Sequence, residues 1–386
     1  MKPLRWFYYL IMSLCLVFGM YSGLRVYYIV FFAQLFVVLS VVAVGVWTVC
    51  AFKYKQELSH ETCVKGKEVT LRLEIHNEKP FPLSLIEASV EVVSRREKIR
   101  LVFSLAPYSG KTFEIPVSTP YRGRFKIGMT KLKITDVFGL VSFPFNMRWL
   151  SFYRMCELVV LPRAHAPGTV SADIADTKLF GDAYLKQAET GDSVSGARPL
   201  RDGDALKRVH WKKSAQQGEL FVKQFEFPER ERVMIMVDTA VHGLSGEEAF
   251  VYADTVCECA ASIALQSLSR NRTVRVINSA DFGVPSECAS LCCFEAVRRH
   301  LALLPFVNEA DLCGALLNAG FRGERKYELF VITRGGAVST QFLERILAAF
   351  RSVTLINVGG QKTGGYINTI HVEPGSDAAQ SLRGLL

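Results

Sequence analysis

Residues 233–238 of this 386-residue chain read Val233-Met234-Ile235-Met236-Val237-Asp238. Five consecutive apolar residues that end in an acid are typical of a strand buried on both faces of a parallel sheet. A helix-compatible stretch follows over 247–269, and further apolar runs at 273–278 and 327–333 alternate with helical stretches. Strands that alternate with helices indicate a parallel sheet with right-handed crossovers. We therefore predict an α/β doubly wound domain over residues 233–386.

The residues upstream of this domain follow a different period. Apolar and polar side chains alternate over Val69–Ile75 and over Arg124–Ile127, and turn residues separate such runs. Several short strands spaced by turns are typical of an antiparallel β-sandwich. We predict such a domain over residues 57–150.

Residues 1–52 contain two uncharged runs. The runs cover about 6–24 and 26–52 and hold 19 and 27 residues. A helix needs about 20 predominantly apolar residues to cross the hydrocarbon of a bilayer. The runs therefore predict two transmembrane helices in a hairpin that turns at Ser22-Gly23. A cleaved signal peptide is the alternative, but no small-x-small cleavage site follows the first run.

The chain carries 46 Lys+Arg against 37 Asp+Glu, a net charge of +9. Residues 53–164 hold 19 basic and 11 acidic residues and so contribute +8 of this charge. Lys2 and Arg5 precede the hairpin, and Lys53 and Lys55 follow it. The positive-inside bias therefore predicts a multi-pass protein of the cell membrane, with its N-terminus and soluble domains in the cytoplasm.

The location of the basic residues also bears on the partner. Basic residues next to a transmembrane helix are attracted to anionic lipids of the inner leaflet. A nucleic-acid-binding protein would instead carry its basic patch and stacking aromatic residues in the distal domain. Residues 233–386 are slightly acidic, with 13 basic and 15 acidic residues. We expect the lipid bilayer as a partner and no nucleic acid.

The ten cysteines are too sparse for a disulfide scaffold, which agrees with a reducing cytoplasm. Cys288, Cys292, Cys293 and Cys313, together with His300, are conceivable metal ligands, but no C-x-x-C pair is present. Buried free cysteines are common in proteins. We expect free thiols, no metal and no cofactor.

Residues 158–232 lie between the two predicted domains and show no simple period. Their densest stretch runs from Gly196 to Ala215 and combines basic, acidic and aromatic side chains. The residues singled out there as a motif or interaction surface are Arg198, Asp202, Gly203, Asp204, Arg208, His210, Trp211, Lys212 and Ala215.

This stretch resembles the signature of the bacterial domain of unknown function 58 family, although Leu200 and Gln216 depart from its pattern. Upstream, Tyr121–Gly128 and Asp136–Leu140 are similar to the family's Arg-Gly-x-Tyr and Asp-Pro-Phe-Gly-Leu elements. The resemblance implies a membrane-anchored protein whose C-terminal domain is similar to a von Willebrand factor A domain. It also implies association with MoxR-type AAA+ ATPases.

The resemblance raises the question of a metal site. An adhesion-type site needs Asp-x-Ser-x-Ser after the first strand, and here Ala240 and His242 stand at the two serine positions after Asp238. A second acid is usual in a later Thr-Asp-Gly, and here the residues are Thr333 and Arg334. An arginine repels a divalent cation. We expect these five residues to form a degenerate site without a metal.

Three interpretations of the signature stretch remain open. In the structural one, Asp202 or Asp204 caps a short helix, Gly203 supplies a positive φ, and Trp211 anchors the stretch against the α/β domain. In the second, basic side chains bind a phosphate, a peptide or an acidic partner; these are Arg198, Lys207, Arg208 and Lys212. In the third, His210 acts as a general base oriented by Asp204, with Ser214 as nucleophile.

We conclude from the sequence that the chain is a membrane-anchored scaffold or assembly protein rather than an enzyme. Its α/β domain is expected to present a docking surface for protein–protein interaction, with a MoxR-type ATPase as the implied partner. We recognise no catalytic motif and no small-molecule substrate. The alternative is a hydrolase of unknown substrate that uses the Asp204/His210 region.

Overall fold

A computed structural model describes most of the chain. The described residues are 2–50, 52–92, 98–136, 138–149, 153–165, 194–200, 209–225, 230–241, 243–280, 287–318, 326–334, 340–360, 368–376 and 378–382. The chain divides into two compact units, Met1–Leu161 and Pro162–Leu386.

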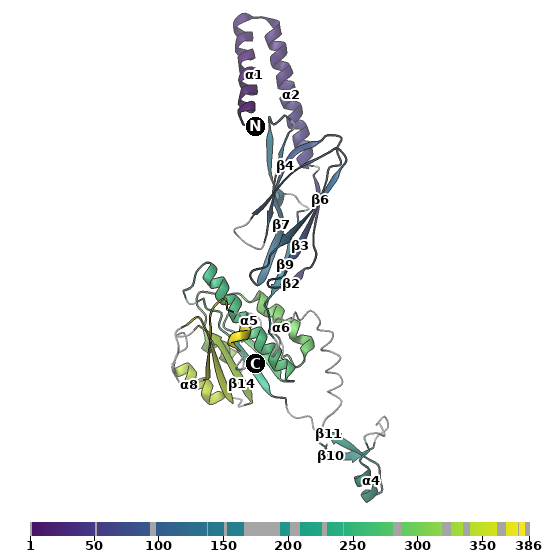
Figure 1. The fold of residues 1–386 in the computed structure, drawn as a ribbon, viewed down its shortest axis with the longest axis vertical. Helices are drawn as coiled ribbons and strands as arrows, with labels where there is room; N and C mark the ends of the chain where they lie inside the picture. The colour runs from purple at the N-terminus through teal and green to yellow at the C-terminus, as the bar shows by residue number, and fades with distance from the viewer. Residues whose placement is uncertain are drawn as a thin grey trace. The chain divides into compact units, whose positions relative to one another are not determined.

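The first unit begins with a helical hairpin, α1 (Lys2–Ser22) and α2 (Arg25–Cys50) (Figure 1). The turn lies where the sequence predicts it, because Gly23 adopts a φ of 64° that only glycine tolerates without cost. Within the described residues, one helix is long and apolar enough to cross a membrane. This is α2, over Arg25–Thr48, with a mean hydropathy of 2.7, and its most apolar 18-residue window has no residue buried inside the protein.

The rest of the first unit is a β domain of two sheets. One sheet has the strand order β1-β3-β6, and the other has the order β2-β9-β7-β4-β5, with β8 paired to β7. All pairings are antiparallel except β2 with β9. The elements are β1 (Lys53–Leu58), β2 (Thr62–Val64), β3 (Val69–His76), β4 (Leu83–Glu91), β5 (Lys98–Leu105), β6 (Gly110–Val117), β7 (Gly123–Thr135), β8 (Ser142–Asn146), the 3-10 helix η1 (Met147–Trp149) and β9 (Cys156–Leu161).

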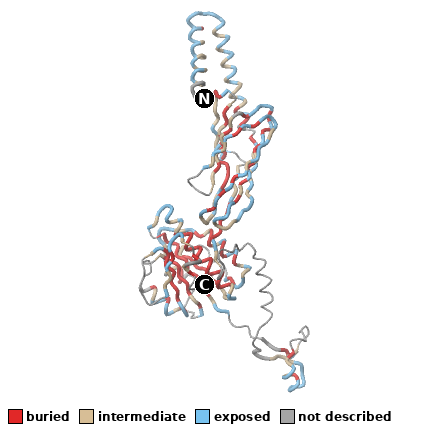
Figure 2. The backbone as a smooth tube through the Cα atoms, in the orientation of Figure 1, coloured by how far each residue is buried: buried red, intermediate tan, exposed pale blue. Residues whose placement is uncertain are grey.

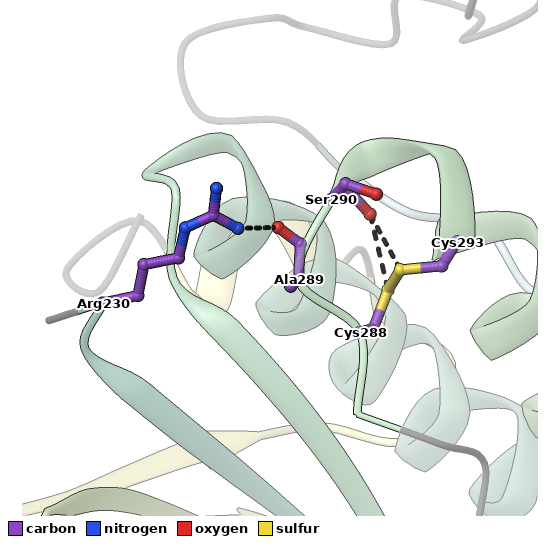
Figure 3. The surroundings of a disulfide bond; sticks show 5 residues. All are labelled: Arg230, Cys288, Ala289, Ser290 and Cys293. Carbon is purple, nitrogen blue, oxygen red and sulfur yellow. Dashed lines mark hydrogen bonds between the residues drawn. A yellow bond between two sulfur atoms is a disulfide. The ribbon is translucent and has the colours of Figure 1, made fainter. Parts of the chain in front are cut away.

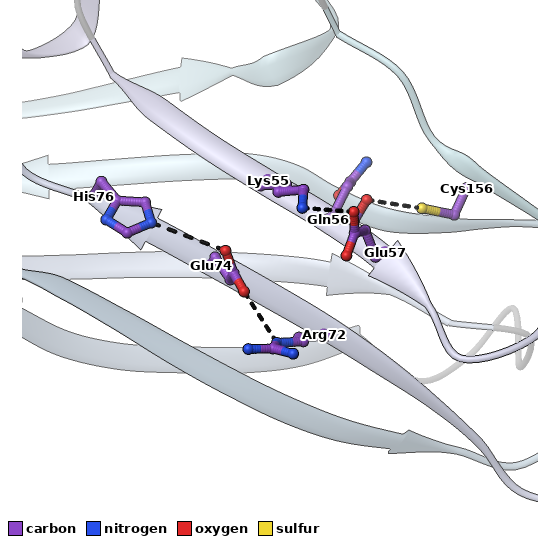
Figure 4. Close-up of polar contacts among 7 residues, drawn as sticks. All are labelled: Lys55, Gln56, Glu57, Arg72, Glu74, His76 and Cys156. Atoms are coloured by element: carbon purple, nitrogen blue, oxygen red, sulfur yellow. Dashed lines mark hydrogen bonds and ion pairs between the residues drawn. The ribbon is translucent and has the colours of Figure 1, made fainter.

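The two sheets bury one hydrophobic core between them (Figure 2). In β3 the period of two is strict: Leu71 and Leu73 are fully buried and pack with Ile86 and Ile127 of the other sheet. The opposite face of β1 and β3 carries ion pairs, including Lys55 Nζ to Glu57 Oε1 at 2.7 Å and Arg72 Nε to Glu74 Oε1 at 3.0 Å (Figure 4). Such exposed pairs contribute about 0–1 kcal/mol each, so the core and the ladders hold this domain together.

The β domain extends beyond the predicted boundary at residue 150. Strand β9 pairs with β7 on one side and with β2 on the other, so it lies inside the six-stranded sheet. Leu158 and Val160 are fully buried in the core. The sequence places Leu158–Leu161 in the signature segment because this short apolar run is separated from the other strands and has no turn signal of its own.

The second unit contains an α/β domain with a five-stranded, fully parallel sheet in the order β13-β12-β14-β15-β16. Its strands are β12 (Arg232–Val237), β13 (Thr273–Asn278), β14 (Tyr327–Thr333), β15 (Ser352–Val358) and β16 (Asn368–Val372). Its helices are α5 (Glu247–Ser269), the 3-10 helix η3 (Leu291–Cys293), α6 (Phe294–Leu303), α7 (Leu312–Asn318), α8 (Thr340–Ala349) and α9 (Ala378–Ser381).

Helices cover both faces of this sheet. Val233, Ile235 and Val237 of β12 pack with α5, α6 and α9, whereas Met234 and Met236 of the same strand pack with α7 and α8. A strand that buries alternate residues in two cores must be apolar throughout, which explains the unbroken run at 233–237. The parallel sheet with helices on both faces agrees with the predicted α/β organisation.

Candidate functional site

Polar side chains collect at the carboxyl edge of the parallel sheet, because parallel strands all end at the same edge. Asp238 follows β12, Ser279 follows β13, and Thr333 ends β14. Asp238 and Thr333 were expected from the sequence. Ser279 was missed, although a polar residue directly after a buried strand is the same signal that Asp238 gives. Ligands of open α/β sheets bind at this edge, so it is the first place to look for a site.

The Asp238 carboxylate is fully buried and accepts hydrogen bonds from three groups. Thr333 Oγ1 donates to Oδ2 at 2.6 Å, and Oδ1 accepts from Ser279 Oγ at 3.3 Å and from the backbone N of Ala240 at 3.0 Å. The Thr239 backbone N also donates to Ser279 Oγ, at 2.8 Å. We call Asp238, Ser279 and Thr333 the Asp238 cluster. Their hydrogen bonds connect the ends of three strands.

The Asp238 cluster does not fit a divalent cation. Both hydroxyls are directed at Asp238, and Arg334 follows Thr333 where a second acid would be needed. Ala240 offers only its backbone N–H to the carboxylate, and His242 lies outside the described residues. The described part of the chain contains no group of three or more His, Cys, Asp or Glu side chains able to hold a metal ion. The donors present are suited to holding a carboxylate.

A cavity of about 460 Å³ adjoins the Asp238 cluster through Tyr252. Burial and the charge of Asp238 raise the pKa of the Tyr252 hydroxyl, and the cation of Arg334 opposes this rise. The cavity is lined by Leu244, Glu247, Glu248, Val251, Tyr252, Arg334, Val358, Gly359 and Pro374. Glu247 and Glu248 lie in the first turn of α5, where the helix dipole favours acids. Of these residues, only Arg334 was singled out from the sequence.

The opposite edge of the sheet is occupied by ion pairs. Arg272 bridges Glu231 at 2.8 Å and Glu328 at 3.0 Å, and Arg351 reaches Glu231 at 3.5 Å. These residues line a smaller depression of about 210 Å³. Because its charges already pair with one another, this edge is less suited to a ligand than the carboxyl edge.

The signature stretch is described in two pieces. Strands β10 (Val194–Pro199) and β11 (Phe221–Phe225) form an antiparallel pair, and helix α4 (Trp211–Gln217) precedes β11. Of the residues singled out from the sequence, Arg198, His210, Trp211, Lys212 and Ala215 are described. Asp202, Gly203, Asp204, Lys207 and Arg208 lie outside the described residues, so the roles proposed for them stay predictions.

His210 and Ser214 both have structural partners. His210 is the N-cap of α4, and its Nδ1 accepts from the backbone N of Lys213 at 3.3 Å. Ser214 Oγ donates to the His210 carbonyl at 3.1 Å and accepts from the Phe221 backbone N at 2.9 Å, which ties α4 to β11. These hydrogen bonds favour the structural interpretation, with His210 as the cap of α4. They give no support to Ser214 as a nucleophile activated by His210.

Trp211 is 67% exposed, and its anchoring against the α/β domain stays a prediction. Arg198 is half-buried, and its Nη1 donates to the Pro199 carbonyl at 3.3 Å. Lys213 Nζ lies 5.4 Å from the centre of the Phe221 ring. An exposed tryptophan beside basic residues leaves the surface interpretation of this stretch open.

Two cysteines expected to be free form a disulfide. Cys288 and Cys293 are bonded, with their Cα atoms 5.8 Å apart, and both sulfurs lie near the carbonyl oxygen of Ser290 (Figure 3). An antiparallel bridge to Val274 fixes Cys288, and the turn of η3 brings Cys293 back to it. Sequence spacing does not reveal this pairing, because it depends on the turn. The disulfide removes cysteine usage as support for a cytoplasmic location, while Cys292 is free and exposed.

Comparison with known proteins supports the resemblance inferred from the signature. Residues 196–359 match the family described as "Protein of unknown function DUF58". The match includes the signature stretch and the first four strands of the parallel sheet, and it covers less than half of the chain. No curated protein matches the chain.

Solved structures resemble the chain only weakly. Proximal thread matrix protein 1 from the mussel byssus is 13% identical with a TM-score of 0.28, and 40% of this chain covers 46% of that one. The alkylpurine DNA glycosylase AlkC of Pseudomonas fluorescens is 16% identical with a TM-score of 0.17, and the match covers 25% of this chain and 30% of the glycosylase. A β-glucosidase of Erythrobacter marinus is 7% identical with a TM-score of 0.18, and the match covers 29% of this chain and 15% of the β-glucosidase. The chain spans less than half the length of each of them.

Proposed function

We propose that this protein is a membrane-anchored scaffold or assembly protein whose α/β domain binds a protein partner at the carboxyl edge of its sheet. The observation that carries the proposal is the cavity of about 460 Å³ beside the Asp238 cluster. Within the cluster, Asp238 is buried and hydrogen-bonded by the chain itself. The groups at this edge that line the cavity are therefore the ones that a partner would contact.

The lining of the cavity suggests the chemistry of the partner segment. Leu244, Val251, Val358 and Pro374 offer apolar surface for one or two apolar side chains. Arg334 adds a cation to this surface, and Glu247 and Glu248 add acids. Apolar pockets with a few charged groups are typical of sites that fix both the position and the orientation of a ligand. A peptide that carries an apolar residue next to charged residues would complement it.

The N-terminal helices supply the anchor in this proposal. Helix α2 is long and apolar enough to cross a membrane, and α1 returns antiparallel to it. With both helices in the bilayer, the two termini of the hairpin and the domains that follow lie in the cytoplasm. The parallel sheet, with Asp238 at the end of β12, supports the likeness to a von Willebrand factor A domain. The partnership with a MoxR-type AAA+ ATPase rests on the family resemblance alone.

Crosslinking in membranes tests the proposed partner. The full-length protein is crosslinked, captured from solubilised membranes and analysed by mass spectrometry. We expect an AAA+ ATPase to be recovered with the wild type and lost with Arg334→Ala. Arg351→Ala is the matched control, because Arg351 is an exposed arginine at the opposite edge of the same sheet. Recovery of no ATPase would refute the partnership, and equal recovery with both variants would refute the carboxyl edge as its site.

A further inference from the structure

The end of the β domain next to the hairpin contacts the last turns of α2. Lys79 is buried, and its Nζ donates to the carbonyl of Thr48 at 2.8 Å, so a loop of the β domain supplies a cation at the C-terminus of the helix. In the same loop, the Phe81 ring packs edge-to-face on Trp47, with the centroids 6.3 Å apart. The loop that holds Lys79 and Phe81 therefore lies level with the end of the apolar span.

The start of α1 contacts a second loop of the same end. Arg5 Nε donates to the carbonyl of Gly139, and its Nη1 donates to Ser142 Oγ at 3.4 Å. Gly139 belongs to the turn between β7 and β8. This turn is built by Asp136, whose carboxylate accepts from the backbone N of Phe138 at 3.0 Å and of Val141 at 2.7 Å. Asp136 and residues 138–140, which belong to the element that the sequence singled out, thus form a hydrogen-bonded turn beside Arg5.

A third loop of this end presents a tyrosine. The backbone N of Tyr108 donates to the carbonyl of Lys79 at 3.2 Å, so the turn between β5 and β6 lies against the loop of Phe81. Tyr108 has a φ of 52°, a conformation that costs a residue other than glycine about 1–2 kcal/mol. The turn therefore carries a large ring at a position where glycine or asparagine would be less strained.

These three loops expose aromatic rings at one end of the β domain. Phe81 is 43% exposed, Tyr108 72% and Phe138 61%. Trp149 is as exposed, at 77%, but it lies beyond the far end of β8, whose other end adjoins the turn of Phe138. At about 3.3 Å per residue, the five residues of β8 carry Trp149 roughly 15 Å along the strand from that turn.

We propose that Phe81, Tyr108 and Phe138 form an aromatic collar that inserts into the headgroup region of the bilayer crossed by the hairpin. The proposal rests on the membrane anchoring stated under Proposed function. Tyrosine favours the membrane–water interface, and phenylalanine on an interfacial surface is buried at the boundary of headgroups and acyl chains. Contacts to Thr48 and Arg5 place the loops at that level. The collar holds the β domain in one orientation relative to the membrane and limits its reorientation about the hairpin.

Exposed aromatic rings also serve as protein-binding surfaces, but the position of the collar favours lipid over a partner protein. A partner protein would have to approach the loops at the level of the helix ends, where lipid headgroups surround a spanning hairpin. A lipid surface is already present there. The Asp136 turn holds Phe138 in place before contact, so little conformational entropy is lost on insertion.

Site-specific photo-crosslinking of the full-length protein tests the collar. p-Benzoylphenylalanine is incorporated singly at positions 81, 108 and 138, with position 149 as the matched exposed control. Each protein is reconstituted into phosphatidylethanolamine–phosphatidylglycerol vesicles, irradiated and analysed by mass spectrometry. We expect lipid adducts at the three collar positions and no lipid adduct at position 149. Vesicle flotation of the same samples reports the anchoring independently.

The outcomes separate the collar from the anchor. A protein that floats with the vesicles but gives no more lipid adduct at 138 than at 149 would overturn the collar and leave the anchoring intact. A protein that does not float with the vesicles would overturn both. Irradiation of whole membranes completes the test, because a protein adduct in place of a lipid adduct at position 138 would make the rings a partner surface and overturn the proposal.

Discussion

The hydrogen bond between Thr333 and Asp238 predicts a measurable loss of stability when the hydroxyl is removed. Thr333→Val keeps the shape of the side chain and replaces the hydroxyl with a methyl group. Both residues are fully buried, and Thr333 Oγ1 lies 2.6 Å from Asp238 Oδ2. In the variant this oxygen of a buried carboxylate loses the hydrogen bond from Thr333.

The expected magnitude follows from the charge of the acceptor. A hydrogen bond to a charged group contributes about 1.5–3 kcal/mol, so we expect the free energy of unfolding of the α/β domain to fall by about 2 kcal/mol. For a unit of roughly 150–250 residues this lowers Tm by about 4–8 °C. Thr333→Ser is the control, because it keeps the hydroxyl and loses only a buried methyl group, at a cost of about 1 kcal/mol.

Differential scanning calorimetry of the full-length protein in detergent measures this effect. The transition of the α/β domain should shift further for Thr333→Val than for Thr333→Ser. If the valine variant melts within about 1 °C of the wild type, the hydrogen bond contributes less than the magnitude used here. If the serine variant is as destabilised as the valine variant, packing rather than the hydroxyl accounts for the loss.

His210→Ala removes the cap of α4, which should cost about 1 kcal/mol of stability and speed amide hydrogen exchange at Lys213. His210→Asn is the control, because asparagine caps helices well and should leave this exchange unchanged. Equal exchange rates in the two variants would contradict the capping role. Burial lowers the pKa of His300 from its ordinary 6.5, so the unfolded state takes up the proton at a higher pH than the folded state does. Stability should therefore be intact above pH 6.5 and fall below it, and a Tm–pH profile that is no flatter in His300→Gln would refute this. Reduction with dithiothreitol should lower stability by about 2 kcal/mol by opening the short Cys288–Cys293 loop, and Cys288→Ser should abolish the Tm response to the reductant.

The secondary structure of the α/β domain was predictable because its signals are local. The run at 233–237 is apolar throughout since both of its faces are buried, and the helix over 247–269 has the bounds of α5. The hairpin turn at Gly23 follows from length, apolarity and one glycine. Strand β9 was misplaced because its membership of the β domain comes from pairing with β7, whose paired residues lie 29 to 37 positions earlier in the chain.

The candidate site was predictable only in part. Asp238 and Thr333 signal their place by ending apolar runs, whereas Glu247, Glu248 and Tyr252 read as ordinary residues of an amphipathic helix. Their approach to Arg334 depends on how α5 packs over the sheet. The pairing of Cys288 with Cys293 likewise depends on the path of a turn.

The sequence by itself determined the hairpin, the alternation of strands with helices and the position of the basic residues, because hydrophobic period and charge are properties of neighbouring residues. The tertiary structure decided which distant side chains meet. It turned an aspartate, a serine and a threonine from three strand ends into one hydrogen-bonded cluster. It also brought Phe81, Tyr108 and Phe138 from three loops to the end of the β domain that contacts the hairpin. Such contacts between distant residues depend on tertiary packing, so they cannot be derived from the local periodicity of the sequence.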